Sequence, residues 1–212
     1  MKKVLLIPII GMMLVCSCNC NDTENKNNEA TEKSENSNLG TADENSNNKN
    51  EQELEVKIDP KFKSFLEKFD KKSLPYSENP TGKEEFDKIS LSEQVNYLSK
   101  AEKLSKKDLE DMAEYTDFFY ISNPLNTSKF HAIVYGRFEM GSTYYFLCTY
   151  NNEGKLLSNI DFAAYELMGA GPQAGQEYNT KGSIDENMEI IVKSDEETRK
   201  YKIQDDGKIV RM

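Results

Sequence analysis

The stretch FHAIVYGRFEMGSTYYFLCTY, residues 130–150, decides the fold of this chain. It is dense in aromatic and β-branched residues that alternate with a period of two, as strands do, and the residues at 140–142 supply a tight turn. Two strands joined so closely are antiparallel neighbours. In the first strand, alternate residues share a face, which gives one set of Phe130, Ala132 and Val134 and another of His131, Ile133 and Tyr135.

The same period continues on both sides of this hairpin. Short polar or glycine-containing turns separate the runs, so we expect an antiparallel β meander of about seven or eight strands. The expected strands are Phe118–Ile121, Phe130–Phe138, Thr143–Tyr150, Leu156–Phe162, Tyr178–Ile184, Met188–Lys193, Thr198–Ile203 and Lys208–Val210.

Helical signals precede the meander. Asp59-Pro60 is a good helix start, and apolar residues follow it at i, i+3, i+4 and i+7. Ser90 to Glu93 has the spacing of a capping box, and a further short helix is expected after Ser105. Two or three short N-terminal helices followed by strands predict a single α+β domain over residues 55–212.

The first residues have a different character. Lys2 and Lys3 precede a twelve-residue apolar run from Val4 to Val15, which suits a signal peptide and is too short to span a bilayer. The run ends in Val-Cys-Ser-Cys at 15–18 and resembles the lipobox of bacterial lipoproteins. The resemblance covers residues 1–18 and implies a signal peptide over 1–17 and lipidation, palmitate included, at Cys18.

One departure from the lipobox pattern leaves alternatives open. Cys16 stands where a small residue is more usual, so Cys16 is a second candidate for lipidation, and Cys20 is a third. An ordinary secretory signal or an uncleaved anchor helix is the other interpretation of the segment. Asn19 after the cysteine implies the outer membrane of the cell envelope, and the acidic residues at 22 and 24 resemble the export signals of Bacteroidota surface lipoproteins. The membrane face stays open.

Residues 18–54 are expected to form a lipidated, disordered tether. Nine acidic and three basic residues lie within 19–53. The three aliphatic residues of this segment cannot bury enough apolar surface to offset the entropy cost of ordering it. The whole chain carries a net charge of −10, which argues against a nucleic-acid partner. The expected partners are the membrane, through the lipid anchor, and an envelope protein or a small ligand.

Catalytic signals are weak. His131 is the sole histidine, so no zinc or histidine cluster is present, and it is expected to be a strand residue with a hydrogen-bonded neighbour. Cys148 shares a strand face with aromatic residues, which favours a core position over a nucleophile. We therefore assign no catalytic, metal or cofactor-binding residue and no cofactor. A carboxylate pair for hydrolysis would have to come from Glu139, Asp161, Glu166 and Glu177.

Two further features can each be interpreted as a functional site or as a structural connection. The loop Gly169–Gly175 is either a lid over a ligand or a connection between strands. Asp205 and Asp206 fit a hairpin turn better than a calcium loop. The sequence also offers a possible sugar-binding platform, although the chain has no tryptophan, from Tyr135, Tyr144, Tyr145 and Tyr150.

The predicted function is that of a non-enzymatic, membrane-anchored envelope lipoprotein with a binding domain, similar in plan to small lipoproteins of Bacteroidota. The alternatives are an inhibitor or immunity protein for a basic envelope toxin or enzyme, a carboxylate-dependent hydrolase, and a purely structural envelope protein.

Overall fold

The computed structural model describes residues 57–83 and 85–212. The predicted signal peptide 1–17, the predicted lipidation site Cys18 and the whole predicted tether 18–54 lie outside the described residues. Contacts group Gln52–Met212 into one compact unit. No helix in the described part of the chain is both long and apolar enough to cross a bilayer.

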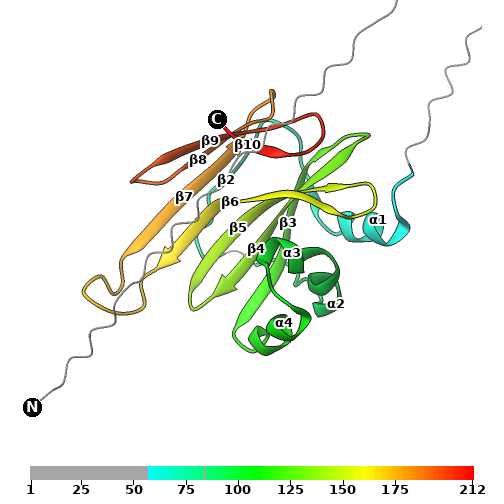
Figure 1. Ribbon diagram of the computed structural model, residues 1–212. Coiled ribbons are helices and arrows are strands. Elements are labelled where there is room, and N and C mark those ends of the chain that lie inside the picture. Colours follow the sequence, from blue (N-terminus) through cyan, green and yellow to red (C-terminus); the bar gives the residue numbers. More distant parts are fainter. Residues whose placement is uncertain (1–56, 84) are drawn as a thin grey trace, which may run out of the picture. The chain divides into compact units, whose positions relative to one another are not determined.

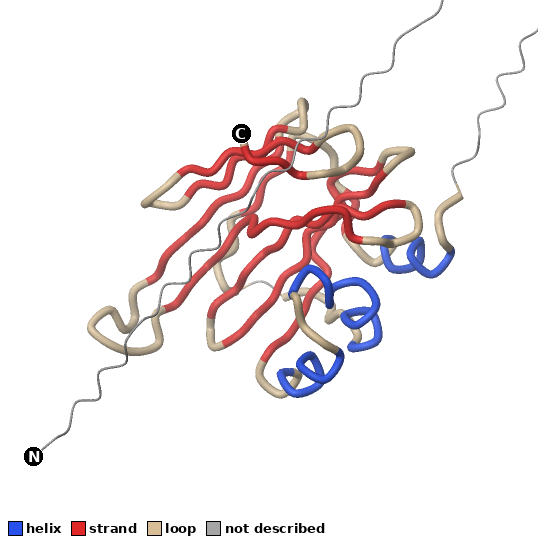
Figure 2. The backbone as a smooth tube through the Cα atoms, in the orientation of Figure 1, coloured by secondary structure: helices blue, strands red, loops and turns tan. Residues whose placement is uncertain are grey.

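Strands make up most of the regular secondary structure in the described chain, and the helices are few and short (Figures 1 and 2). The helical segments are α1 (Pro60–Leu66), α2 (Leu91–Glu93), the π-helical turn η1 (Gln94–Leu98), α3 (Ser99–Glu102) and α4 (Lys106–Met112). Asp59 caps α1, because its carboxylate accepts from the backbone N–H groups of Lys61 and Phe62. Ser105 and Asp108 form a reciprocal capping box at α4.

Ten strands form the sheet. They are β1 (Asp70–Lys71), β2 (Tyr76–Glu78), β3 (Thr116–Asn126), β4 (Phe130–Glu139), β5 (Ser142–Asn151), β6 (Leu156–Leu167), β7 (Glu177–Ile184), β8 (Glu189–Lys193), β9 (Thr198–Ile203) and β10 (Ile209–Arg211). From β3 to β10 each strand pairs with the next, and all of these pairs are antiparallel.

Strand β7 belongs to two parts of the sheet. Its first half pairs with β6, and its second half pairs with β8 on one side and β2 on the other. Gly182 lies where β7 leaves β6, and a Cβ there would be 2.5 Å from the backbone oxygen of Phe162. The close approach therefore requires glycine at this position.

The strands β3 to β5 are buried on both faces. One face packs against the helices, in a core that contains Phe62, Phe65, Leu98, Leu109, Ile133, Tyr135, Cys148 and Tyr150. The other face packs against strands β7 to β9, in a core that contains Phe130, Ala132, Val134, Leu147, Phe162, Ile184, Ile190, Val192 and Ile203. The central strands therefore carry buried apolar side chains on both faces, as burial on two faces requires.

The expected fold class needs correction in its detail. Residues 57–83 and 85–212 form a mostly antiparallel sheet of ten strands with a few short helices, and strands β1 and β2 separate the first of these helices from the others. These two strands, of two and three residues, are too short to show a period-two pattern. Strand β1 pairs in parallel with β3, and a bridge from Lys88 to Phe119 covers more of that outer edge.

Candidate functional site

A groove follows strands β5, β6, β7 and β9, and we call it the arginine groove. Its inner part is a cavity of about 280 Å³ whose walls carry charged and aromatic side chains. The residues that line this part are Arg137, Tyr144, Tyr145, Phe146, Asp161, Ala163, Ala164, Glu166, Thr180 and Arg199. Its outer part is an adjoining cavity of about 440 Å³ that shares Glu166, Thr180 and Arg199 and reaches the β8–β9 turn.

Arg137 forms one fixed wall of the groove. Its Nη1 donates to Glu102 Oε2 at 2.5 Å, and its Nε lies 3.4 Å from Glu139. The guanidinium also lies over the rings of Tyr144 and Phe146, 5.4 and 5.1 Å from their centroids. These contacts hold the planar group in one orientation, as preorganised binding sites require.

Arg199 comes from β9 and brings a second cation to the groove. Its Nε lies 3.0 Å from a carboxylate oxygen of Glu197, and its side chain is 25% exposed. Asp161 and Glu166 line the same inner cavity, so both signs of charge meet there. A cavity with a guanidinium, carboxylates and aromatic walls suits a small polar ligand that carries both charges.

Sequence reasoning missed both arginines and Glu102. The signal for Arg137 was nevertheless present, because its odd-numbered position puts it on the strand face that holds Ile133 and Tyr135. A cation on an inward face needs a buried counterion. Nothing in the sequence pattern pointed to Arg199.

The predicted hydrolytic carboxylates are spread over the structure. Asp161 and Glu166 line the inner cavity, and Glu166 also lines the outer one. Glu139 lies beside Arg137, and Glu177 is an exposed residue at the start of β7. The side chain of Glu102 is 3% exposed, and its carboxylate is held by Arg137 and by the hydroxyl of Tyr135 at 2.6 Å, so it is occupied by contacts within the domain.

Gly169–Gly175 forms the tip of the β6–β7 hairpin. Backbone hydrogen bonds between Met168 and Gln176 and between Gly175 and Met168 close the tip. A Cβ added at Gly169, Gly171 or Gly175 would meet nothing within 4 Å, so these residues lie against open space. Gln173 alone of this loop lines the outer cavity, and the loop is therefore an edge of the groove and not a cover over it.

His131 is a structural residue. It is 3% exposed, and its Nδ1 and Nε2 lie 2.8 Å from Asn126 Oδ1 and 2.9 Å from Asn152 Oδ1. Asn152 in turn donates to the backbone oxygen of Ser128, which fixes the orientation of its amide. Burial lowers the pKa of His131, and the hydrogen bond with Asn152 opposes part of that effect.

Cys148 is a free thiol with no access to solvent. Burial raises the pKa of the thiol, which opposes formation of a nucleophilic thiolate. In the β4–β5 ladder Cys148 faces Ile133, whereas His131 faces Tyr150. The geometry therefore does not join the cysteine and the histidine into a catalytic pair.

The tyrosines proposed as a sugar platform are mostly core residues. Tyr135, Tyr145 and Tyr150 are at most 1% exposed, and only Tyr144 is half-buried at the groove. Asp205 and Asp206 lie in the β9–β10 turn, where Asp206 accepts from the backbone N–H of Lys208. Such a side-chain to backbone contact is typical of a β-hairpin turn, which is what the sequence predicted.

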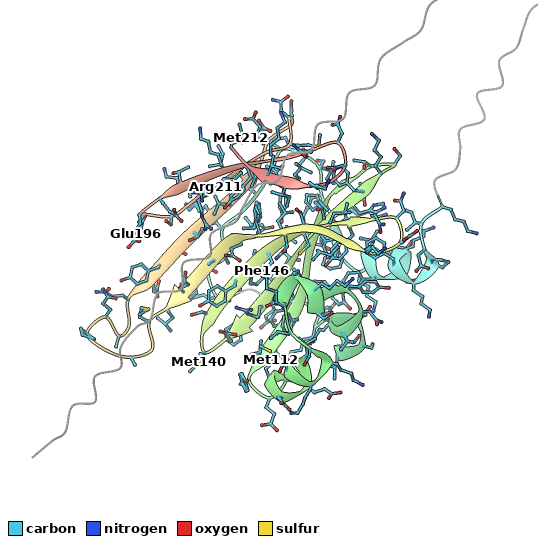
Figure 3. The ribbon with its side chains drawn as sticks, viewed as in Figure 1. Met112, Met140, Phe146, Glu196, Arg211 and Met212 are labelled. Atoms are coloured by element: carbon cyan, nitrogen blue, oxygen red, sulfur yellow. The ribbon has the colours of Figure 1, made fainter. Side chains whose placement is uncertain are left out.

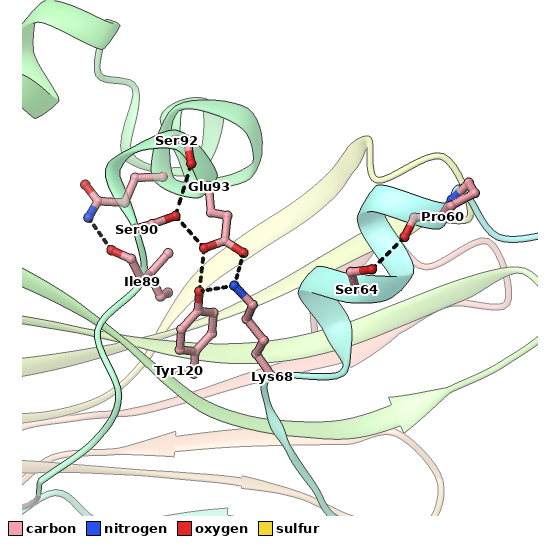
Figure 4. A network of polar contacts seen from close by, with 9 residues as sticks. Pro60, Ser64, Lys68, Ile89, Ser90, Ser92, Glu93 and Tyr120 are labelled. Carbon is pink, nitrogen blue, oxygen red and sulfur yellow. Dashed lines mark hydrogen bonds and ion pairs between the residues drawn. The ribbon is translucent and has the colours of Figure 1, made fainter.

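A second polar network joins the segment after α1, helix α2 and strand β3 (Figure 4). Glu93 accepts from Lys68 at 2.7 Å, from Tyr120 at 2.6 Å and from Ser90 at 2.5 Å. Burial opposes ionisation of Glu93, but these hydrogen bonds outweigh it and lower the pKa. Burial and the bond to Glu93 raise the pKa of Tyr120 to about 12. The carboxylate stays ionised and the phenol stays protonated, so the network is an anchor between elements.

The serine that was expected to cap the helix takes part in this network instead. Ser90 donates its hydroxyl to Glu93, and no side-chain cap is formed at α2. The segment then continues as the π-helical turn η1. The capping-box spacing therefore predicted the start of the helix correctly, but Ser90 contacts the Glu93 side chain and not the helix backbone.

Within residues 57–83 and 85–212, no three His, Cys, Asp or Glu side chains come together in a way that would hold a metal ion. No protein-family model, curated protein or solved structure matches this chain.

Proposed function

We propose that this chain is a non-enzymatic envelope lipoprotein, held on a membrane through Cys18, whose domain binds a small polar ligand in the arginine groove. The observation that carries the binding role is the pair of guanidinium groups, Arg137, which Glu102 fixes, and Arg199, beside the carboxylates of Asp161 and Glu166. The anchoring role rests on the sequence at residues 1–18.

The chemistry of the groove favours a zwitterion, such as an amino acid or the end of a peptide. A guanidinium forms paired hydrogen bonds with a ligand carboxylate, and Asp161 or Glu166 accepts from a ligand ammonium group. The aromatic rings under Arg137 supply an apolar wall for the rest of the ligand. The inner cavity of about 280 Å³ has the volume of a small ligand site.

The anchor is tested by replacing one cysteine at a time in the full-length chain. We expect Cys18→Ala to abolish incorporation of labelled palmitate and to release the protein from the membrane fraction. Cys20→Ala is the matched control and should leave both unchanged. Retention of the label in Cys18→Ala would reject Cys18 as the lipidation site.

The groove is tested by thermal unfolding of the full-length protein with pools of free amino acids and dipeptides, and with neutral disaccharides for comparison. A ligand at 100 times its Kd stabilises the folded state by about 2.7 kcal/mol, which is readily measured. We expect stabilisation by a zwitterion, its loss in Arg199→Gln and its persistence in Arg211→Gln. Arg211 is an exposed arginine on β10 and is absent from the groove lining (Figure 3). Equal binding by both variants would reject the groove.

The inhibitor or immunity function is a second candidate, and the β8–β9 turn favours it. Asp195, Glu196 and Glu197 are exposed there, at the rim of the outer cavity. A complex with a basic toxin or enzyme held by these charges would weaken steeply as salt is added. A complex that is insensitive to salt would count against this function.

A further inference from the structure

Met140 occupies a position that disfavours methionine in two ways. With Gly141 it forms the two-residue turn between β4 and β5, and the φ angles are 51° for Met140 and 86° for Gly141. Turns with two positive φ angles prefer Asn, Asp and Gly, because a larger side chain is strained there. The Met140 side chain is also 87% exposed, so it gains nothing from burial.

Met188 shows what usually offsets such strain. Its φ is 62°, but its side chain is partly buried and packs against the core between the two parts of the sheet. Met140 has no such contact within the described chain. When no intramolecular contact offsets the energy of a strained backbone position, we infer that the residue is kept for a contact with another molecule.

Tyr115 is a second exposed apolar side chain at the same place. The last pair of the β3–β4 ladder joins Thr116 to Glu139, so Tyr115 and Met140 are each one residue beyond it. Tyr115 is 63% exposed. Tyrosine and methionine are both enriched in protein interfaces and supply large contact areas.

This end of the sheet lies opposite the point where the described chain enters the domain. The backbone N–H of Asp59 donates to the oxygen of Asn152, just beyond the other end of β5. Strand β5 has ten residues and therefore separates the two ends by roughly 30 Å. Figure 3 shows Met140 at the free end of its hairpin.

The charge around Tyr115 selects the kind of partner. Residues 106–117 contain five carboxylates and two lysines. Each of these lysines pairs with an acid one helical turn away, and Lys88 pairs with Asp117, so the carboxylates of Asp108 and Glu114 remain outside the ion pairs. This acidic surface repels the anionic headgroups of a membrane. It complements a protein whose apolar socket is surrounded by basic residues.

We propose that Met140 and Tyr115 are the anchor residues of a protein-binding surface, and that the partner presents an apolar socket with a basic rim. This surface is a different site from the arginine groove, since neither residue lines that groove. The small-ligand function and the protein interface can therefore fail separately.

The test begins with the full-length chain on its own membranes, carrying a photoreactive phenylalanine at position 140. Position 129, an exposed turn residue at the other end of β4, is the matched control. A protein cross-linked from 140 and not from 129 is identified by mass spectrometry and purified. Its affinity is then measured with the unmodified chain, with Met140→Asn and with Met212→Asn, which removes another exposed methionine.

We expect Met140→Asn to weaken binding about tenfold or more, as the loss of an interface anchor does, and Met212→Asn to leave it unchanged. Added salt should weaken binding of the unmodified chain. Met140→Asn should also raise the midpoint of unfolding, because asparagine tolerates positive φ, so weaker binding would not reflect loss of the fold. The proposal is overturned by cross-links to lipid alone, to a second copy of this chain alone or to nothing. Equal binding by Met140→Asn, or binding indifferent to salt, overturns it as well.

Discussion

The guanidinium of Arg137 and the carboxylate of Glu102 form an ion pair that joins strand β4 to helix α3, with Nη1 2.5 Å from Oε2. The side chains are 21% and 3% exposed, and the two residues are 35 positions apart in the sequence. The same carboxylate accepts from the hydroxyl of Tyr135. This pair fixes one wall of the arginine groove and attaches a helix to the sheet.

Loss of the Glu102 charge should therefore destabilise the fold. Glu102→Gln leaves Arg137 partly buried without its main counterion, and we expect a loss of about 2–3 kcal/mol, reduced from the fully buried case because Arg137 is partly exposed. Glu110→Gln is the control, since Glu110 and Lys106 form an exposed pair worth about 0.5 kcal/mol or less. Urea denaturation measures both, and equal losses would contradict the structural role of Glu102.

The stability of the domain should fall in mildly acidic solution because of His131. Burial lowers the pKa of this histidine in the folded state, so the unfolded state binds the proton more readily. Stability is then full above the unfolded pKa of about 6.5 and decreases as the pH falls below it.

His131→Gln tests this assignment, because it removes the sole histidine of the chain. We expect the variant to be less stable at neutral pH, since it loses the paired contacts to Asn126 and Asn152, but to show a flatter pH dependence between about pH 5 and pH 7. Unfolding midpoints across that range provide the measurement. An unchanged slope would assign the pH dependence to carboxylates instead.

The alternation in residues 130–135 correctly predicted which side chains share a strand face. Phe130 and Val134 lie in the core between the two parts of the sheet, whereas Ile133 and Tyr135 lie in the core beneath the helices. Such local patterns can be predicted from the sequence because successive side chains of a strand point to opposite faces of the sheet. The helix starts at Asp59 and Ser105 were readable for the same reason, since a cap involves neighbours in the sequence.

The parts that could not be predicted depend on contacts distant in the sequence. The parallel pairing of β1 with β3 joins Asp70 to Ser122, and two residues leave no periodic signal. The groove requires Arg137 and Arg199 to converge from different strands. Even with Arg137 recognised as an inward-facing cation, the chain holds 37 acidic residues, and spacing could not select Glu102 among them.

The close approach of β7 to β6 at Gly182 should make the stability of the fold sensitive to one added methyl group. A Cβ at Gly182 would lie 2.5 Å from the backbone oxygen of Phe162 and 2.7 Å from its ring. Because backbone cannot yield as a flexible side chain does, we expect Gly182→Ala to cost about 3 kcal/mol. Gly169→Ala is the control, since nothing lies within 4 Å of a Cβ there. Similar unfolding midpoints for the two variants would show that the strands separate more easily than the structure implies.

The thiol of Cys148 should report opening of the core between helices and sheet. It is fully buried and burial raises its pKa, so a thiol reagent at neutral pH reaches it only after the core opens. In a chain that begins at Gln52, where the compact unit starts, Cys148 is the sole cysteine. We expect labelling to be slow in the native protein and rapid in denaturant. Ser128→Cys, at an exposed turn, is the control and should add a thiol that reacts at once. Native labelling of Cys148 as fast as that of the added thiol would mean that the helices do not stay closed over the sheet.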